Sequence, residues 1–308
     1  MKASYFDRYG PPEVLTYGDF PDPVRGAGEV VVDIHAVSVN AADWKTRSDH
    51  YGDTVRPLPH ILGRDLSGVV REAGSDTPGL RVGDEVFAIC DATLEGSYAE
   101  RIAIKADIVG KKPKRTSHIE TAALALTGLT AINAIETTLQ LKKGETILIQ
   151  GGAGGVAGFA LQLAKYIGAR VITTASKNNH DYLYGLGADQ VIDYNTTDFT
   201  QVVSGCDAVF DTVGGDVAQR SFAVIRPGGR AAFVGGGRKA PVSPRADVAS
   251  LRPAVGRGWA QLERIVTLID SGAIRPPTIT VFPLAEAVAA HRLSESRHLQ
   301  GKIVLAVR

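Results

Sequence analysis

The chain has 308 residues, which is enough for about two domains with a sizeable core. Its 34 Lys and Arg residues nearly balance its 33 Asp and Glu residues, and a formal charge of +1 gives no long-range field to attract nucleic acid or an anionic membrane. No apolar stretch approaches the roughly 18 residues of a membrane span and the first residues do not resemble a signal peptide, so we expect a soluble, cytoplasmic protein.

The first 110 residues contain short apolar runs that are broken by glycine and proline, such as "VLTYGDF", "EVVVDIHAVSV" and "DEVFAIC". Such runs are typical of an irregular β domain. Cys90 lies in this region and Cys206 lies far beyond it, and neither has a second cysteine or a histidine at ligand spacing. We therefore expect two buried free thiols rather than a disulfide framework or a zinc module.

Helical and extended patterns alternate between about residues 118 and 268. "HIETAALALTGLTAINAIETTLQL" and "GVAGFALQLAKYIG" predict helices, and "ETILIQ", "ARVITTAS", "QVIDY", "DAVFDTV" and "RAAFVGG" predict strands. Strands that alternate with helices predict parallel β-α-β units. The tail from "ITVFP" onward returns to strand, helix and strand.

A glycine-rich turn joins one of these strands to the next helix in "ETILIQGGAGGVAGFALQLAK". Gly152, Gly154 and Ala157 have the spacing of the dinucleotide fingerprint, in which small residues allow a tight turn and a close approach to the pyrophosphate. Gly155 and Val156 would open the helix, whose N-terminus offers N–H groups and a positive dipole end to the phosphates. The pattern predicts a dinucleotide site.

The end of the following strand indicates which dinucleotide binds. NAD sites place a carboxylate there for the ribose 2′-hydroxyl, whereas "VITTASKNN" places Ser176 and Lys177. A hydroxyl and an ammonium suit a 2′-phosphate, so NADPH is favoured over NADH; the alternative is that Lys177 is only an exposed lysine. Tyr194, which ends "VIDY", is expected in the same adenosine pocket.

Several other chemistries lack their motifs. The sequence contains no G-x-x-x-x-G-K-[ST] loop, no G-x-S-x-G elbow, and no tyrosine followed four residues later by lysine. Nucleotide hydrolysis, the common serine-hydrolase route and the short-chain reductase route are therefore disfavoured.

Taken together, the motifs resemble the medium-chain dehydrogenase/reductase superfamily, and within it the zinc-independent, zeta-crystallin-like quinone oxidoreductase branch. The resemblance covers essentially the whole chain through "SVNAADWKTR", "PHILGRDLSGVV", "LRVGDEVFA", "GSYAE", "LTGLTA", "GGAGGVAG", "LGADQVIDY", "VFDTVGG" and "AHRLSESRHLQGKIVL", in family order.

The resemblance implies an α/β fold with two domains. A Rossmann domain with a doubly wound parallel sheet would span residues 119–263, and a GroES-like irregular β-barrel substrate domain would combine residues 1–118 and 264–308. The family places its active site in the cleft between the two domains. By analogy with this branch we also expect a homodimer.

The zinc-dependent members of the superfamily provide a test for a catalytic metal. Asn40 takes the position of their first cysteine, Arg64 takes that of the histidine, and Leu126 falls near the last ligand. None of these side chains is a plausible zinc ligand, and the cysteine-rich loop of the structural zinc site is missing too, so no zinc is expected. Without a metal to polarise a carbonyl, the better substrates are quinones and enones, because hydride added to a conjugated carbon leaves charge on a distant oxygen that hydrogen bonds can stabilise.

The resemblance also assigns candidate site residues. Asn40 and Asp43 would lie near the nicotinamide, with Asn40 as a donor to the substrate oxygen or the nicotinamide amide; the alternative is that both cap a helix at "ADWKTR". Tyr51 is a candidate proton donor or a plain loop tyrosine. The remaining predicted cofactor contacts are Thr130, beside the nicotinamide, and Gly214 and Gly235, at the carboxyl ends of strands.

The leading interpretation is an NADPH-dependent reductase of quinones or α,β-unsaturated ketones. An enoyl-thioester or polyketide-intermediate reductase is the alternative enzyme, since the arginine-rich stretch 226–257 would suit an acidic carrier as well as a solvated surface. An alternative from another class is a non-catalytic NADPH-binding protein of the crystallin or regulatory kind, in which Trp44 blocks the nicotinamide position.

Overall fold

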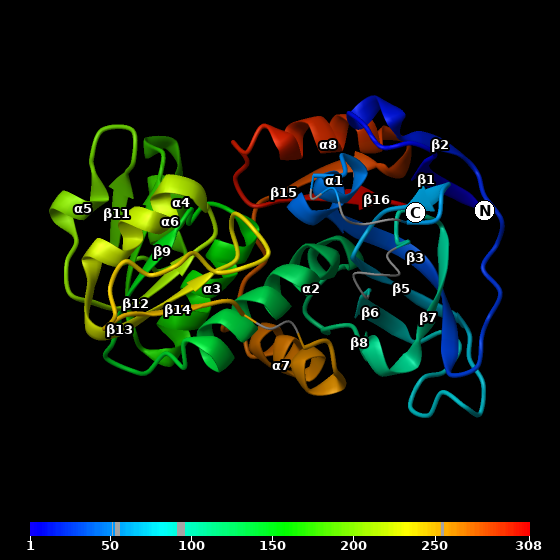
Figure 1. Cartoon of the computed structure of the whole chain (residues 1–308). Helices are drawn as coiled ribbons and strands as arrows, with labels where there is room; N and C mark the ends of the chain where they lie inside the picture. The colour runs from blue at the N-terminus through cyan, green and yellow to red at the C-terminus, as the bar shows by residue number, and fades with distance from the viewer. Residues whose placement is uncertain (51, 53–55, 91–95, 254–255) are drawn as a thin grey trace. The chain divides into compact units, whose positions relative to one another are not determined.

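The computed structural model of the chain describes residues 1–50, 52, 56–90, 96–253 and 256–308. These residues form two compact units, one made of residues 1–126 and 257–308 and the other of residues 127–256 (Figure 1). We call them unit 1 and unit 2. The predicted domain division at 118/119 and 263/264 stays a prediction.

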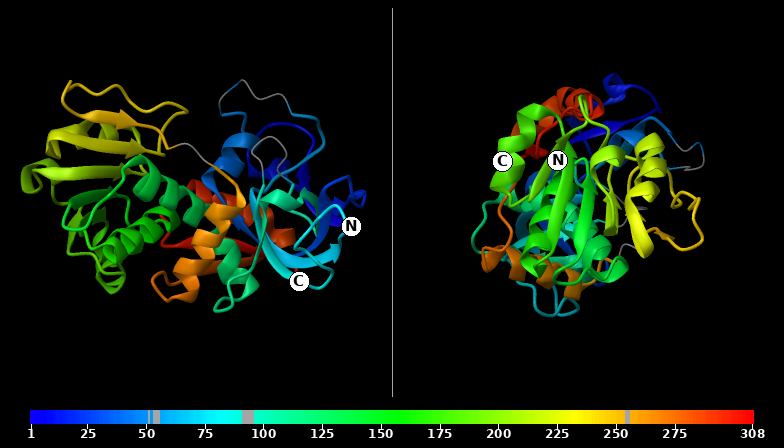
Figure 2. Two further views of the ribbon diagram at one scale, coloured as in Figure 1. Left: turned by 90° about the horizontal axis from the view of Figure 1, so that it is seen from below. Right: turned by 90° about the vertical axis from the view of Figure 1, so that its left-hand side faces the viewer.

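Unit 1 is built on a seven-stranded sheet to which both ends of the chain contribute (Figure 2). The strands follow the order β15 (Ile279–Pro283), β16 (Lys302–Ala306), β3 (Glu29–Val39), β5 (Asp65–Glu72), β6 (Glu85–Ile89) and β8 (Val109–Lys111), and β7 (Arg101–Lys105) also pairs with β3. A smaller sheet has the order β2 (Thr16–Asp19), β1 (Lys2–Phe6) and β4 (His60–Ile61). Because β16 pairs antiparallel with the end of β3, residues at the two ends of the chain become neighbours.

Helices complete unit 1. The short α1 (Ala41–Arg47) follows β3 directly, and α8 (Ala287–Glu295) contacts both α1 and β3. The other helices of the unit are α7 (Trp259–Asp270) and the first part of α2 (His118–Ile132), which continues as a π-helical turn at Asn133–Thr138. Val32, Ile34 and Leu66 belong to its apolar core, with Tyr98 fully buried beside them.

Unit 2 contains a six-stranded, all-parallel sheet with helices against it (Figures 1 and 2). Its order is β11 (Gln190–Asp193), β10 (Arg170–Ala175), β9 (Thr146–Gln150), β12 (Cys206–Asp211), β13 (Ile225–Phe233) and β14 (Ala249–Leu251). Counted from β9, this is the 3-2-1-4-5-6 order of doubly wound dinucleotide folds. The helices are α3 (Gly155–Ile167), α4 (His180–Gly185), α5 (Phe199–Val202) and α6 (Gly215–Ser221).

The local sequence explains why β9 and α3 form where they do. β9 is apolar and almost wholly buried, as expected for a strand in the centre of a parallel sheet. Gly154 has an extended backbone and immediately precedes α3, and Gly168 follows it in the left-handed conformation that favours glycine. The predicted α/β class, with a doubly wound parallel sheet and an irregular β domain, is confirmed.

Cys90 and Cys206 are both buried, as predicted, and neither is in a disulfide. Within the described ranges, no helix is both long enough and apolar enough to cross a bilayer.

Candidate functional site

Asn40 lies at the junction of β3 and α1, where it is only 9% exposed. Its side-chain oxygen accepts a hydrogen bond from the ammonium of Lys302 at 2.8 Å. Its amide nitrogen donates to Asp65 Oδ2 and to the Ser38 carbonyl, both at 3.2 Å. Because an ammonium group only donates, Lys302 determines which end of the Asn40 amide is the oxygen.

Asp65 is the buried carboxylate of this cluster. It accepts the backbone N–H of Ser38 at 2.8 Å and the Ser38 hydroxyl at 2.6 Å. Burial raises the pKa of Asp65, and the charge of Lys302 opposes that change. Burial likewise lowers the pKa of Lys302, and the charges of Asp65 and Asp43 oppose it. The carboxylates and the ammonium therefore stabilise each other's charged forms inside the protein.

Asp43 lies on the first turn of α1 and is fully buried. Its Oδ2 accepts the backbone N–H of Asn40 at 2.7 Å and the hydroxyl of Tyr98 at 3.1 Å. The first contact is the carboxylate half of a capping box, so Asp43 makes the local bracing contact that the sequence suggested as one alternative. The Asn40 side chain also hydrogen bonds to Lys302 and Asp65.

A second set of buried polar groups lies at the other end of α1. The guanidinium of Arg47 is 2.7 Å from His291 Nδ1 and donates to Glu295 at 2.6 Å and to the Gly10 carbonyl at 3.1 Å. His291 Nε2 is 3.2 Å from the Tyr98 hydroxyl. Burial, followed by the charge of Arg47, lowers the pKa of His291 to about 3, so this ring is neutral at ordinary pH.

Arg64 and Leu126 occupy the other two positions that the sequence resemblance aligned with zinc ligands. Arg64 immediately precedes β5 and donates to the Thr46 hydroxyl at 3.2 Å. Leu126 lies within α2. Among the residues that the structure describes, no three His, Cys, Asp or Glu side chains are grouped so that they could hold a metal ion. Tyr51, the predicted proton donor, lies outside the described residues.

The glycine turn of unit 2 has the geometry that a close backbone approach requires. Gly151 has a φ of +76°, a value that favours glycine. A Cβ atom on Gly152 would lie 2.2 Å from the hydroxyl oxygen of Thr173, so no larger residue fits there without displacement. Gly154 then leads into α3, whose first residues are Gly155 and Val156. The N–H groups of this first turn have no partners within the helix and suit a phosphate.

The predicted adenosine contacts come together at one edge of the sheet. β10 and β11 are parallel neighbours, with Ala175 opposite Asp193, so Ser176 and Tyr194 follow adjacent strand ends. Lys177 comes next and is exposed, and Tyr194 is 53% exposed. A hydroxyl, an ammonium and an aromatic ring thus share the carboxyl edge beside the glycine turn.

Gly214 and Gly235 have a structural requirement of their own. A Cβ on Gly214 would lie 2.5 Å from the backbone nitrogen of Gly236, and one on Gly235 would lie 2.6 Å from that of Gly214. The loops after β12 and β13 therefore pack backbone against backbone. Asp211 accepts the Gly214 N–H at 2.7 Å, and burial raises the pKa of this carboxyl to about 6. Cofactor contacts of Gly214, Gly235 and the α2 residue Thr130 stay predictions.

Several members of the unit 1 cluster were missed from the sequence, namely Ser38, Asp65, Tyr98, His291 and Lys302. The sequence did contain one indication. Lys302 is the first residue of the final strand "KIVLA", and the four residues that follow it are all apolar. A lysine at a buried strand position requires a partner.

Three arginines of the stretch 226–257 pair with carboxylates of the protein itself. Arg230 pairs with Glu145 at 2.7 Å, Arg226 pairs with Asp207 and Arg245 pairs with Asp247, each at 2.6 Å. The first two of these pairs join β13 to the residue before β9 and to β12. They give no particular support to binding of an acidic carrier.

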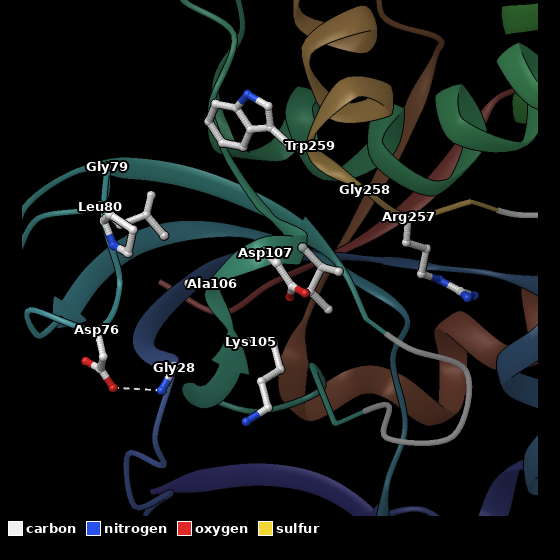
Figure 3. A pocket seen from close by; sticks show the side chains of 12 residues that line it. Gly28, Asp76, Gly79, Leu80, Lys105, Ala106, Asp107, Arg257, Gly258 and Trp259 are labelled. Atoms are coloured by element: carbon white, nitrogen blue, oxygen red, sulfur yellow. Dashed lines mark hydrogen bonds between the residues drawn. The ribbon is translucent and has the colours of Figure 1, made fainter.

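A separate pocket of about 910 Å³ lies in unit 1 and contains none of the predicted site residues (Figure 3). Trp259, which is half exposed, lines it together with Asp76 and Lys105. Asp76 accepts the Gly28 N–H at 2.7 Å, and Lys105 pairs with Glu29 at 3.3 Å. Asp76 also pairs with Arg25, so both of these side chains already have partners, and we assign the pocket no role.

His35 and His118 form a pair of neighbouring, tilted rings in unit 1. The rings of His35 and His118 are 4.4 Å apart, and His118 also contacts Ser67 at 2.7 Å and Glu85 at 3.3 Å. Burial and then the neighbouring His35 lower the pKa of His118 from 6.5 to about 4. As the pH falls from 6.5 to about 4, the unfolded chain binds a proton that the folded chain does not.

We therefore expect the free energy of unfolding to decrease as the pH is lowered through this window. This single proton accounts for at most about 1.4 kcal/mol per pH unit. The measurement is denaturant unfolding at several pH values. His118→Gln should flatten the dependence between pH 6.5 and 4. An unchanged dependence in that variant would show that other groups cause it.

Comparison with known proteins agrees with this architecture. A family model described as alcohol dehydrogenase GroES-like domain matches residues 26–114, and one described as zinc-binding dehydrogenase matches residues 186–305. The 2-methylene-furan-3-one reductase of Solanum lycopersicum is 32% identical over 316 residues, which cover 99% of this chain and 79% of that protein.

Solved structures of the same kind superpose over the whole chain. The quinone oxidoreductase from Coxiella burnetii has a TM-score of 0.89 and 35% identity, with 100% of this chain and 99% of that chain covered. The Escherichia coli quinone oxidoreductase complexed with NADPH has a TM-score of 0.90 and 28% identity, with both chains covered completely.

The GroES-like unit and the doubly wound unit with its glycine turn define an oxidoreductase of the two-domain dehydrogenase class. The chain belongs to the medium-chain dehydrogenase/reductase family, in its zinc-independent branch of quinone oxidoreductases and enone reductases. The family predicted from the motifs is thereby confirmed.

Proposed function

We propose that the protein transfers hydride from NADPH to a quinone or an α,β-unsaturated ketone, without zinc. The observation that carries the proposal is the carboxyl edge of unit 2, where the glycine turn, Ser176, Lys177 and Tyr194 lie together with no carboxylate at the end of β10. Relatives support the substrate class, since one is a 2-methylene-furan-3-one reductase and others are quinone oxidoreductases.

Each part of the chain has a distinct task in this proposal. The bound dinucleotide supplies the hydride. The turn at Gly152 and Gly154 and the start of α3 hold its pyrophosphate, and Lys177 offsets the charge of its 2′-phosphate. In unit 1 Asn40, held in one orientation, provides a polar end for the substrate, and its neighbours limit the access of water.

The acceptor must fit this chemistry. Hydride addition to the β-carbon of a conjugated carbonyl moves charge to the oxygen, where hydrogen bonds stabilise it and a proton completes the reduction. We propose Tyr51 as the proton donor. Asn40, whose amide is held by Ser38, Asp65 and Lys302, is proposed as a fixed polar group against which the acceptor is positioned, with Asp43 bracing its backbone. The direct test follows NADPH oxidation with quinones, short enones and enoyl thioesters.

Each result of this assay assigns one function. Turnover with quinones or enones supports the proposal, and turnover only with enoyl thioesters assigns the alternative enzyme. Tight NADPH binding without any turnover identifies a non-catalytic NADPH-binding protein instead. Zinc bound stoichiometrically to the purified protein would contradict the metal-free mechanism.

Cofactor preference depends on Lys177. Its ammonium is exposed at the end of β10, so Lys177→Ala should weaken NADPH binding by about tenfold, as expected for loss of one phosphate contact of about 1–2 kcal/mol, and leave NADH binding unchanged. The measurement is Kd for both cofactors. Lys165→Ala is the control, because that lysine pairs with Asp189 at 2.8 Å. An unchanged preference in Lys177→Ala would refute the 2′-phosphate assignment.

The cytoplasmic location and the homodimer remain predictions of the sequence. Size-exclusion chromatography with light scattering measures the number of subunits directly.

A further inference from the structure

A continuous chain of hydrogen bonds runs through the interior of unit 1 from α8 to the start of α1. Glu295 accepts from Arg47 at 2.6 Å, Arg47 contacts His291 at 2.7 Å, His291 contacts Tyr98 at 3.2 Å, and Tyr98 donates to Asp43 at 3.1 Å. Arg47, His291, Tyr98 and Asp43 are each no more than 1% exposed. This series of hydrogen bonds is therefore shielded from solvent except at its Glu295 end.

Donation along this series of hydrogen bonds can run in only one direction. Arginine only donates, so His291 Nδ1 must accept and cannot carry a hydrogen. The hydrogen of the neutral ring is then on Nε2 and is donated to the Tyr98 oxygen. The Tyr98 hydroxyl in turn donates to Asp43 Oδ2. One tautomer of His291 is thus compatible with these three contacts.

This direction of donation makes Asp43 the acceptor at the end of the series. Its Oδ2 accepts both the Tyr98 hydroxyl and the backbone N–H of Asn40. Two donors on one oxygen fix the carboxylate, and the carboxylate fixes the backbone at the junction of β3 and α1. The polar end of the Asn40 side chain is therefore held from two sides, by Lys302 on its amide and by Asp43 on its backbone.

Packing alone does not account for such a chain. Burying polar and charged groups costs free energy, and apolar side chains of similar volume often serve stability equally well or better. A network in which donor and acceptor alternate from Arg47 to Asn40 instead specifies geometry.

We propose that His291 and Tyr98 are positioning residues for the reaction, which act through Asp43 to hold Asn40 in place. The inference rests on the proposed function, since it is there that Asn40 meets the substrate. Neither residue contacts the substrate itself. Their loss should therefore lower kcat and leave the binding of NADPH to unit 2 unaffected.

The experiment compares two substitutions of His291. Glutamine can accept from Arg47 through its oxygen and donate to Tyr98 through its nitrogen, whereas leucine fills space and can do neither. We expect His291→Leu and Tyr98→Phe to lower kcat at least tenfold with KM for NADPH unchanged, and His291→Gln to recover to within about threefold of the parent. Equal kcat values for the leucine and glutamine variants would overturn the positioning role.

A second readout is independent of activity. Nitrogen-15 NMR of histidine-labelled protein, assigned by the signals missing in His291→Gln, should show Nδ1 without a hydrogen and Nε2 with one. A hydrogen on Nδ1, or a doubly protonated ring at neutral pH, would contradict the direction of the chain and so the proposal.

The two proposals fail in distinguishable ways. If the parent protein turns over no quinone, enone or thioester, the proposed function fails and the positioning role fails with it. If the parent is active and His291→Leu matches it, only the positioning role is wrong.

Discussion

Lys302→Met should lower the free energy of unfolding by about 3–5 kcal/mol, because it leaves a buried carboxylate without its counter-charge. Asp65 is fully buried and Lys302 is 6% exposed, so water cannot replace the missing ammonium. The substitution also removes the donor to the Asn40 oxygen and to the Val39 carbonyl. Denaturant unfolding measures the effect.

Two further variants isolate the cause. Adding Asp65→Asn to Lys302→Met removes the uncompensated charge and should recover part of the loss, because an amide can still accept from Ser38. Lys105→Met is the control, since Lys105 is 52% exposed and pairs with Glu29 at the surface, where a pair contributes about 0–1 kcal/mol. A loss for Lys302→Met no larger than for Lys105→Met would mean that Asp65 is protonated in the folded protein.

Gly152→Ala should weaken NADPH binding by about 10- to 100-fold. The new Cβ would lie 2.2 Å from Thr173 Oγ1, and Thr173 is itself fixed by its hydrogen bond of 2.6 Å to the Ile149 carbonyl. Overpacking of this kind costs about 1–3 kcal/mol and is relieved only if the turn moves away from the pyrophosphate position. Titration calorimetry measures the change in Kd.

Gly185→Ala is the matched control for this prediction. Gly185 ends α4 in the same unit, and a Cβ there meets nothing within 4 Å. We expect its Kd for NADPH to equal that of the parent. If Gly152→Ala also retains the parent Kd, the glycine turn does not hold the pyrophosphate.

The dinucleotide site could be predicted from the sequence because its determinants are local. A strand, a glycine turn and a helix follow one another within "ETILIQGGAGGVAGFALQLAK", and each step restricts the backbone by itself. The proximity of Ser176 and Tyr194 could also be predicted, because parallel strands end at the same edge of a sheet.

The buried network of unit 1 could not be predicted in this way. Asn40 and Lys302 are 262 positions apart, and Arg47 and His291 are 244 apart. Only the pairing of β16 with β3 and the packing of α8 on α1 bring them together. The sequence identified Asn40 and Asp43 as polar residues at the end of a strand, but their partners depend on contacts between the two ends of the chain.

The proposed reaction delivers hydride from NADPH to the conjugated carbon of the acceptor. It is tested most directly with NADPH deuterated at C4, in both stereochemical forms, and a short α,β-unsaturated ketone, followed by mass spectrometry and NMR of the product. We predict a saturated ketone with one deuterium at the β-carbon from one of the two forms. Deuterium at the carbonyl carbon of an alcohol, or a product without deuterium from either form, would contradict the mechanism.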